Sequence, residues 1–203
     1  MEIVCFPVTP FFTNCYIVKE GSEAMVIDPG EVTAPMKDYL ADCTVTMIIN
    51  THCHCDHCGG NAELKKLTGA PLLCHKDDLP LLHSLADQGR MFGVPFPPSP
   101  EPDRFLEHGE QLSLGDTVFE VRHTPGHAPG HVVLITPGVA FVGDVLFAGS
   151  VGRTDLPGGS MRQLMQSIRE HLLDLDDNTV VYSGHGPETT IGEERATNPF
   201  LVN

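Results

Sequence analysis

Basic residues are scarce in this 203-residue sequence. It has 12 lysines and arginines against 27 aspartates and glutamates, which gives a formal net charge of −15 at pH 7. Binding to the phosphates of nucleic acids or to anionic membranes depends on clusters of lysine and arginine. The composition therefore argues against nucleic acid and membranes as partners and leaves small molecules as the expected substrate class.

Long apolar runs and a disulfide framework are also missing. No stretch approaches the roughly 20 apolar residues that span a bilayer, and the start of the chain has neither the basic residues nor the apolar run of a signal peptide. The seven cysteines are odd in number, and three of them, Cys53, Cys55 and Cys58, lie within six residues. Disulfide frameworks are usually even and spread out, so we expect reduced thiols and a cytoplasmic protein.

The sequence has no repeat and no low-complexity linker. The Pro-rich segment 94–100 is the only candidate boundary, and it is too short to join two domains, so it predicts a surface loop. Hydrophobic residues make up 41% of the chain, which is enough for a core. We expect one domain over 1–203.

Alternating short strands and helices are expected along the chain. The patterns predict strands at 2–8, 12–18, 24–28, 45–49, 71–74, 117–122, 131–136, 139–143 and 179–182. They predict helices at 33–42, 59–67, near 77–88, and after two capping boxes at 160–163 and 190–193. This order indicates an α/β or α+β protein with two β-rich halves that each carry helices.

The segment Thr51-His-Cys-His-Cys-Asp-His57 carries the strongest chemical signal. On an extended segment His52, His54 and Asp56 project to one side, and His57 breaks that alternation. Three imidazoles and a carboxylate are more than one divalent ion needs from a local segment, and they suit zinc, iron or manganese. A solvated polar loop is a much weaker explanation of so dense a cluster after a buried strand.

Three later residues complete a ligand set. His127, Asp144 and His185 each follow a predicted strand and stand next to a glycine, which permits a tight turn. Taken singly, each is more typical of an ordinary polar residue at a strand end. Together with the first cluster they indicate a metal site built from both halves of the chain.

In order and context these residues resemble the metal motif of the metallo-β-lactamase superfamily. The segments 124–131, 143–147 and 184–187 are most similar to its glyoxalase II branch, and the ending 194–201 is similar to the short, single-domain hydroxyacylglutathione hydrolases of that branch. The resemblance implies a four-layer αββα sandwich that binds two divalent metal ions, with zinc the first expectation and iron or manganese as alternatives. It implies one ion on His52, His54 and His127, a second on Asp56, His57 and His185, and a bridging Asp144.

The resemblance also implies a reaction. A hydroxide on the metal ions would attack a thioester such as S-lactoylglutathione, because metal binding lowers the pKa of water from about 15.7 to about 7. Asp56 is expected to take part in catalysis. Arg153 matches a basic position that contacts the glutathione carboxylate, whereas Asp155 stands where an aromatic residue is typical, and the chain ends at Asn203 without the additional helical region of full-length members.

Two other functions stay open. A persulfide dioxygenase with a single iron resembles the sequence at 51–54 and at 152–155, and a non-catalytic metal-binding protein would use the same ligands. We expect Cys53, Cys55 and Cys58 to be packing residues rather than ligands. For the six remaining histidines, at 75, 83, 108, 123, 131 and 171, we expect ordinary hydrogen bonding, and for Asp28 we expect a bracing role through backbone hydrogen bonds.

Overall fold

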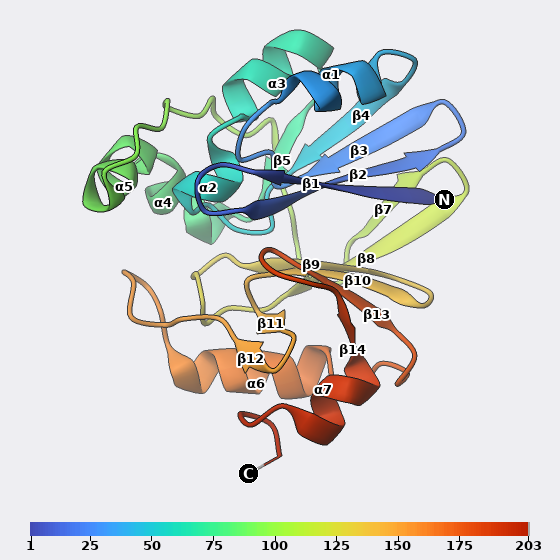
Figure 1. Cartoon of the computed structure of the whole chain (residues 1–203), viewed down its shortest axis with the longest axis vertical. Coiled ribbons are helices and arrows are strands. Elements are labelled where there is room, and N and C mark those ends of the chain that lie inside the picture. Colours follow the sequence, from blue (N-terminus) through green and yellow to red (C-terminus); the bar gives the residue numbers. More distant parts are fainter. Residues whose placement is uncertain (203) are drawn as a thin grey trace.

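Two six-stranded sheets face each other in the computed structural model, which describes residues 1–202 (Figure 1). The first sheet has the order β1 (Glu2–Val8), β2 (Thr13–Glu20), β3 (Glu23–Ile27), β4 (Thr44–Ile49), β5 (Leu72–Cys74) and β6 (Arg104–Phe105). The second has the order β14 (Thr189–Thr190), β13 (Val180–Ser183), β10 (Val139–Gly143), β9 (Val132–Thr136), β8 (Thr117–His123) and β7 (Gln111–Leu114). A small hairpin joins β11 (Leu146–Phe147) to β12 (Ser150–Val151).

Helices cover the outer face of each sheet. α1 (Ala34–Leu40) and α3 (Asn61–Thr68) lie on the first sheet, and α6 (Met161–His171) and α7 (Ile191–Thr197) lie on the second (Figure 1). Met36 of α1 and Leu64 of α3 pack with Val26 of the first sheet. Leu164 of α6 packs with Val181 of the second sheet. The predicted four-layer αββα arrangement is confirmed.

The alternation of side chains along the strands creates these layers. In β3, Met25 and Ile27 face the space between the two sheets and share a core with Phe119, whereas Ala24 and Val26 face the helices. Successive residues of a strand point to opposite faces, so a strand that is covered on both sides must be apolar throughout. Full burial of each large side chain contributes roughly 1.5–3 kcal/mol.

Both predicted capping boxes begin helices. The Ser160 hydroxyl accepts a hydrogen bond from the Gln163 N–H at 3.4 Å, and Thr190 accepts one from the Glu193 N–H at 3.2 Å. Each hydroxyl satisfies a backbone donor that has no partner inside its helix. The capping residues therefore set where α6 and α7 start.

The prediction of a single helix near 77–88 is wrong. The chain forms a 3₁₀ turn (Lys76–Asp78), α4 (Leu79–Leu82) and α5 (Leu85–Phe92) instead. Pro80 lies in the first turn of α4, where its missing N–H costs nothing. The Gln88 side chain then donates to the Leu81 carbonyl at 2.7 Å, which supplies a partner for the end of α4 and permits a new helix.

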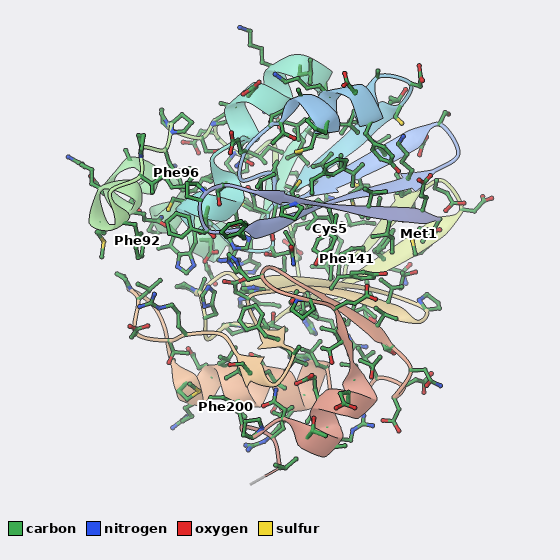
Figure 2. All side chains as sticks on the ribbon, in the orientation of Figure 1. Met1, Cys5, Phe92, Phe96, Phe141 and Phe200 are labelled. Carbon is green, nitrogen blue, oxygen red and sulfur yellow. The ribbon has the colours of Figure 1, made fainter. Side chains whose placement is uncertain are left out.

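The Pro-rich segment 94–100 is a loop, as predicted, but it is not wholly at the surface. Phe96 is buried in a cluster with Cys53, Cys58 and Leu85. In Figure 2, Phe92 and Phe96 lie on the side of the molecule where α5 stands apart from the sheets. None of the helices in the described residues is long and apolar enough to cross a membrane.

Candidate metal centre

All seven predicted ligands gather at one end of the sandwich, between the two sheets. They come from segments that are far apart in the sequence: the loop after β4, the short helix α2 (Cys55–Cys58), and the loops after β8, β10 and β13. β3 and β4 are parallel, as are β10 and β13, so these strands deliver their carboxyl ends to the same edge. The topology therefore assembles one site from both halves of the chain.

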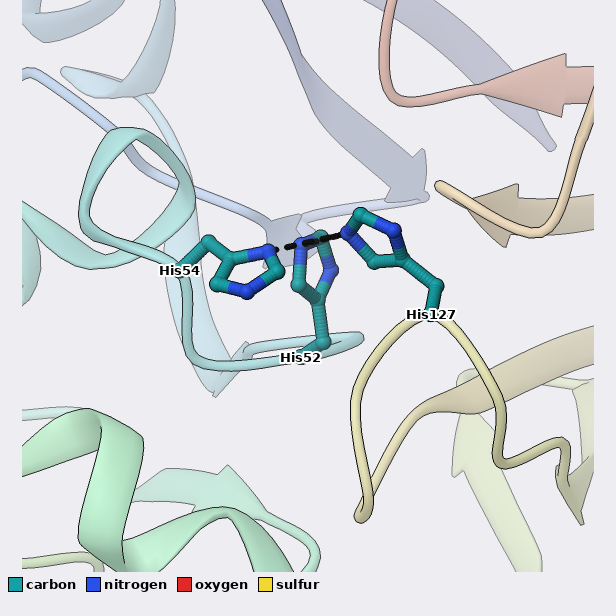
Figure 3. A group of neighbouring side chains, drawn as sticks. All are labelled: His52, His54 and His127. Carbon is teal, nitrogen blue, oxygen red and sulfur yellow. Dashed lines mark hydrogen bonds between the residues drawn. The ribbon is translucent and has the colours of Figure 1, made fainter. Parts of the chain in front are cut away.

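The first triad contains His52, His54 and His127 (Figure 3). His127 Nε2 lies 2.9 Å from His54 Nδ1 and 3.2 Å from His52 Nε2. Burial lowers the pKa of all three imidazoles, so they are neutral at pH 7. His127 Nδ1 donates to the Arg153 carbonyl at 2.8 Å, which leaves the Nε2 lone pair directed at the other two rings. Three imidazole nitrogens that face one another at these distances suit a zinc or iron ion.

The second triad contains Asp56, His57 and His185. The Asp56 Oδ2 atom lies 3.5 Å from His57 Nε2 and 3.3 Å from His185 Nε2. Burial lowers the pKa of His57, but the carboxylates of Asp56, Asp144 and Asp28 outweigh it and raise this pKa to about 10. The local field is therefore strongly negative and favours a cation.

Asp144 stands between the two triads. Its Oδ2 atom is 3.5 Å from His127 Nε2 and 3.5 Å from His185 Nε2, and its Oδ1 atom is 3.6 Å from His57 Nε2. Within the described part of the chain, His57 Nε2 and Asp144 Oδ1 are buried and have no hydrogen-bonding partner. Buried polar atoms are costly when unpaired, so these two fit metal ligation, and the donor set as a whole fits two divalent ions.

The extended conformation predicted for residues 52–56 is wrong at its end. His54 is still extended, with ψ at 151°, but α2 begins at Cys55 and places Asp56 in its first turn. The Cys55 N–H donates to the Gln88 side chain at 2.9 Å, and the His57 N–H donates to the His54 carbonyl. This turn lets Asp56 and His57, neighbours in sequence, both reach the second triad.

Asp28 braces the site as predicted. Its carboxylate accepts hydrogen bonds from the Thr51 N–H and the Thr51 hydroxyl, each at 2.7 Å. It also lies 3.0 Å from His57 Nδ1. A carboxylate at Nδ1 fixes the ring orientation and leaves Nε2 free to bind a metal ion.

His131 does more than the ordinary hydrogen bonding expected from the sequence. The Asp144 N–H donates to His131 Nε2 at 3.1 Å, and the His131 ring stacks on His52 with centroids 4.8 Å apart. Burial lowers the pKa of His131 well below its usual range, so the ring is neutral and can accept this hydrogen bond. His131 thus positions one residue of the site and packs behind another. His123 lies 2.9 Å from the Pro129 carbonyl through Nε2, and its ring stacks on His75 with centroids 4.1 Å apart.

Two further positioning residues, Thr13 and Asp78, were not found from the sequence. Thr13 donates its hydroxyl to Asp56 Oδ2 at 2.8 Å. Asp78 is buried and accepts the Cys53 N–H at 2.9 Å and the Gly130 N–H at 2.5 Å, which ties the two ligand loops together. Both act across distant parts of the chain, so no local pattern marks them.

Asp78 supports a prediction about pH. Burial raises its pKa to about 6, although hydrogen bonds from Gly130 and Cys53 oppose the shift. The folded protein then binds this proton more tightly than the unfolded chain, so the stabilisation is complete below about pH 4 and is lost as the pH rises to about 6. In metal-free protein, the unfolding free energy of wild type relative to Asp78→Asn should fall by roughly 2 kcal/mol over that interval.

Urea unfolding of both proteins at several pH values measures this difference. The histidine ligands titrate alike in the two proteins and cancel from it. A difference that stays constant from pH 4 to pH 6.5 would show that Asp78 keeps an ordinary pKa.

The three clustered cysteines are buried, as predicted. Cys53, Cys55 and Cys58 pack with Cys74, and all seven cysteines of the chain are free. Burial raises the pKa of Cys55 to about 12 and that of Cys58 to about 11. Such thiols are protonated at neutral pH and act as small apolar side chains.

A cavity of about 520 Å³ opens over the candidate metal centre. His54, Asp56, His127, Asp144 and His185 form its floor. Its walls come from α4, α5, the turn before β2 and the loop that follows β12. The site is therefore open to a small molecule.

Arg153 lines this cavity, as its predicted role requires. Its guanidinium group, however, donates two hydrogen bonds of 2.7 Å to the carboxylate of Asp155. The side chain is therefore close to the site but engaged by its own neighbour.

The model of the metallo-beta-lactamase superfamily matches residues 8–185. This chain belongs to the metallo-β-lactamase superfamily. Hydroxyacylglutathione hydrolase GloC of Haemophilus influenzae is 40% identical over 99% of this chain and 98% of its own length. Human mitochondrial persulfide dioxygenase ETHE1 is 32% identical over 97% of this chain and 73% of its own length.

Two solved structures of the superfamily match the whole architecture. BLEG-1 B3 metallo-beta-lactamase has a TM-score of 0.92 and 36% identity, with each chain covered completely. TTHA1623 in a di-iron-bound form has a TM-score of 0.89 and 40% identity over 98% of this chain and 100% of its own. Superfamily membership thus agrees with the paired triads, while the relatives differ in their named activities and one of them holds iron.

Proposed function

We propose that this protein is a metal-dependent hydrolase that cleaves thioesters by means of two divalent metal ions. The arrangement of Asp144 between two ligand triads, under an open cavity, carries the proposal. The similarity to a hydroxyacylglutathione hydrolase supports thioesters as the substrate class. S-lactoylglutathione is accordingly the first substrate to test.

In this proposal His52, His54 and His127 hold one ion, Asp56, His57 and His185 hold the other, and Asp144 contacts both. Ions bound there would supply a water of lowered pKa and would polarise the substrate carbonyl. Zinc is the first candidate, and iron or manganese suits the same histidine and carboxylate donors.

The protein itself positions the reactants. Asp56 lies on the cavity floor, where the Thr13 hydroxyl fixes its carboxylate, and is placed to orient the attacking water as a hydrogen-bond acceptor while the water proton passes to solvent. Burial raises the pKa of Asp56, but the nearby His57 and hydrogen bonds from His185 and Thr13 outweigh it and hold this pKa well below its usual range, so Asp56 is a carboxylate at neutral pH. The water oxygen bonds to the carbonyl carbon, the C–S bond breaks, and sulfur leaves with the electron pair as a thiolate.

Metal removal and return test the proposal. Protein stripped with a chelator should lose at least about 99% of its S-lactoylglutathione hydrolysis. Zinc, manganese or iron added separately should restore it in proportion to metal content, up to two ions per chain. Hydrolysis that is unchanged in metal-free protein would refute the mechanism.

A persulfide dioxygenase is the competing function, favoured by the 32% identity to the human enzyme of that name. It would oxidise glutathione persulfide with a single iron. One iron per chain, with persulfide-dependent oxygen consumption and no thioester hydrolysis, would replace our proposal. A protein that binds metal and performs neither reaction would be a non-catalytic binder.

A further inference from the structure

The walls of the cavity above the metal centre are apolar. Six side chains from four segments form them: Phe11, Leu81, Met91, Phe92, Leu156 and Pro157. Met91 is 69% exposed and Phe92 is 43% exposed, so the cavity mouth presents large hydrophobic groups to water. Phe92 contacts Phe11 edge to face, with ring centroids 5.6 Å apart. Figure 2 shows the position of Phe92, on the side of the molecule where α5 lies.

The polar groups on the α5 wall are used within the protein. Gln88 donates to the Leu81 carbonyl at 2.7 Å and accepts the Cys55 N–H at 2.9 Å. The Ser84 hydroxyl donates to the Leu81 carbonyl at 3.0 Å. A substrate that reaches this wall therefore meets hydrocarbon rather than free hydrogen-bonding groups.

The cations near the mouth are paired with acidic residues. Arg153, the one lysine or arginine among the described residues that line the cavity, is held by both oxygens of Asp155, and Arg90 pairs with Asp87 on the rim. Exposed ion pairs are weak and can open. Even so, a substrate carboxylate that displaced Asp155 or Asp87 would remain beside that acidic side chain, in a protein whose net charge is −15. Glutathione carries two carboxylates and one ammonium group, so this mouth offers its carboxylates no unpaired arginine.

We propose that the cavity selects thioesters by an apolar acyl group, such as an aryl-alkyl or medium-length alkyl chain, and not by a glutathione carrier. The inference rests on the proposed thioester hydrolysis and names its substrate class. Burial of apolar surface against Phe11, Phe92 and Leu156 supplies the binding energy. The small, polar lactoyl group leaves most of this surface exposed.

A panel of four thioesters separates the acyl group from the carrier. Lactoyl and phenylacetyl groups are each attached to glutathione and to the neutral thiol N-acetylcysteamine, and each kcat/KM is divided by the rate constant for hydroxide hydrolysis of that compound. On either carrier, phenylacetyl should exceed lactoyl by at least about tenfold. For either acyl group, replacing glutathione by N-acetylcysteamine should change this normalised kcat/KM by less than about threefold.

Three variants locate the effect. Phe92→Ala should reduce the phenylacetyl-to-lactoyl ratio by about fivefold or more. Phe105→Ala, which removes another exposed phenylalanine outside the cavity lining, should leave the ratio unchanged. Asp155→Asn should release Arg153. The kcat/KM of the glutathione substrates should then rise severalfold relative to that of the N-acetylcysteamine substrates.

Binding of the corresponding non-hydrolysable thioethers, measured by calorimetry, gives a second reading that does not depend on turnover. The phenylethyl compound should bind at least about tenfold more tightly than the hydroxypropyl compound. S-lactoylglutathione as the best of the four substrates would overturn this inference and leave the proposed function intact. If none of the four is hydrolysed by fully metal-loaded protein, the proposed function fails, and the calorimetry still decides whether the cavity prefers apolar groups.

Discussion

Replacing Asp56 by alanine is expected to lower the kcat/KM of thioester hydrolysis by about a thousandfold or more and to reduce bound metal from two ions to one per chain. Asp56 contributes the only carboxylate of the second triad, whereas the first triad of three histidines does not use it. One ion should therefore stay on His52, His54 and His127. Elemental analysis of the purified variant, combined with initial rates, measures both effects.

The matched control is Asp116→Ala, which removes an exposed carboxylate from the turn between β7 and β8, outside the cavity lining. It should keep both ions and the full rate. Added zinc or manganese should restore part of the Asp56→Ala activity by refilling a weakened second position. Full turnover in Asp56→Ala would refute the two-ion mechanism, and unchanged iron content with retained persulfide-dependent oxygen uptake would favour the dioxygenase.

Asp28→Ala should be the most destabilising single substitution near the site. The change leaves the Thr51 N–H, the Thr51 hydroxyl and His57 Nδ1 without their shared acceptor in a buried position. Breaking a buried charged network by removing one partner costs roughly 3–5 kcal/mol. Asp28 also has a positive φ of 53°, a conformation that alanine tolerates less well than aspartate or asparagine.

Asp28→Asn separates these contributions. Asparagine tolerates the positive φ and keeps one oxygen acceptor for Thr51, so its loss of stability should be about half that of alanine. Urea unfolding with and without metal measures both variants, and a 3–5 kcal/mol loss corresponds to a decrease in Tm of roughly 6–20 °C for a chain of this size. A loss below about 1 kcal/mol for Asp28→Ala would show that the network carries little of the stability.

The sequence was sufficient for the residues whose neighbours are local. His52, His54, Asp56 and His57 stand within six positions, so their density alone predicts a metal site. The capping boxes at Ser160 and Thr190 also follow from residues three positions apart, and both helices begin there. In α6, Leu164 and Ile168 are buried, whereas Met161 at its start is 41% exposed.

The distant residues of the site were weaker predictions, and only the family motif assigned them to the two ions. His127, Asp144 and His185 each follow a strand, but the strand order that brings those ends to one edge cannot be read from local pattern. The structure places each of them within 3.6 Å of another predicted ligand. The position of Asp144 between both triads is thus a property of the sheet topology.

Gly184 stands where the packed side chains of the site leave no room for a Cβ atom. A Cβ atom at this position would collide with Asp144 Oδ1 and with the His57 ring. The glycine therefore allows the β13 loop to approach the other ligands closely. A sequence pattern predicts a turn here, but only the packed structure shows which side chains fill the space.

The amino-acid sequence by itself determined the cluster of histidine and aspartate residues that suits a metal ion, the acidic net charge, and the strands whose side chains alternate between two buried faces. These depend on residue type and on spacing over a few positions, which a linear sequence displays directly. Tertiary structure alone decided that α2 turns Asp56 towards the second triad, that His131 holds Asp144, that Asp78 joins two loops, and that Asp155 engages Arg153 beside an apolar cavity. Most of these contacts join residues far apart in the chain, and they form only because burial of the shared core fixes the loops relative to one another.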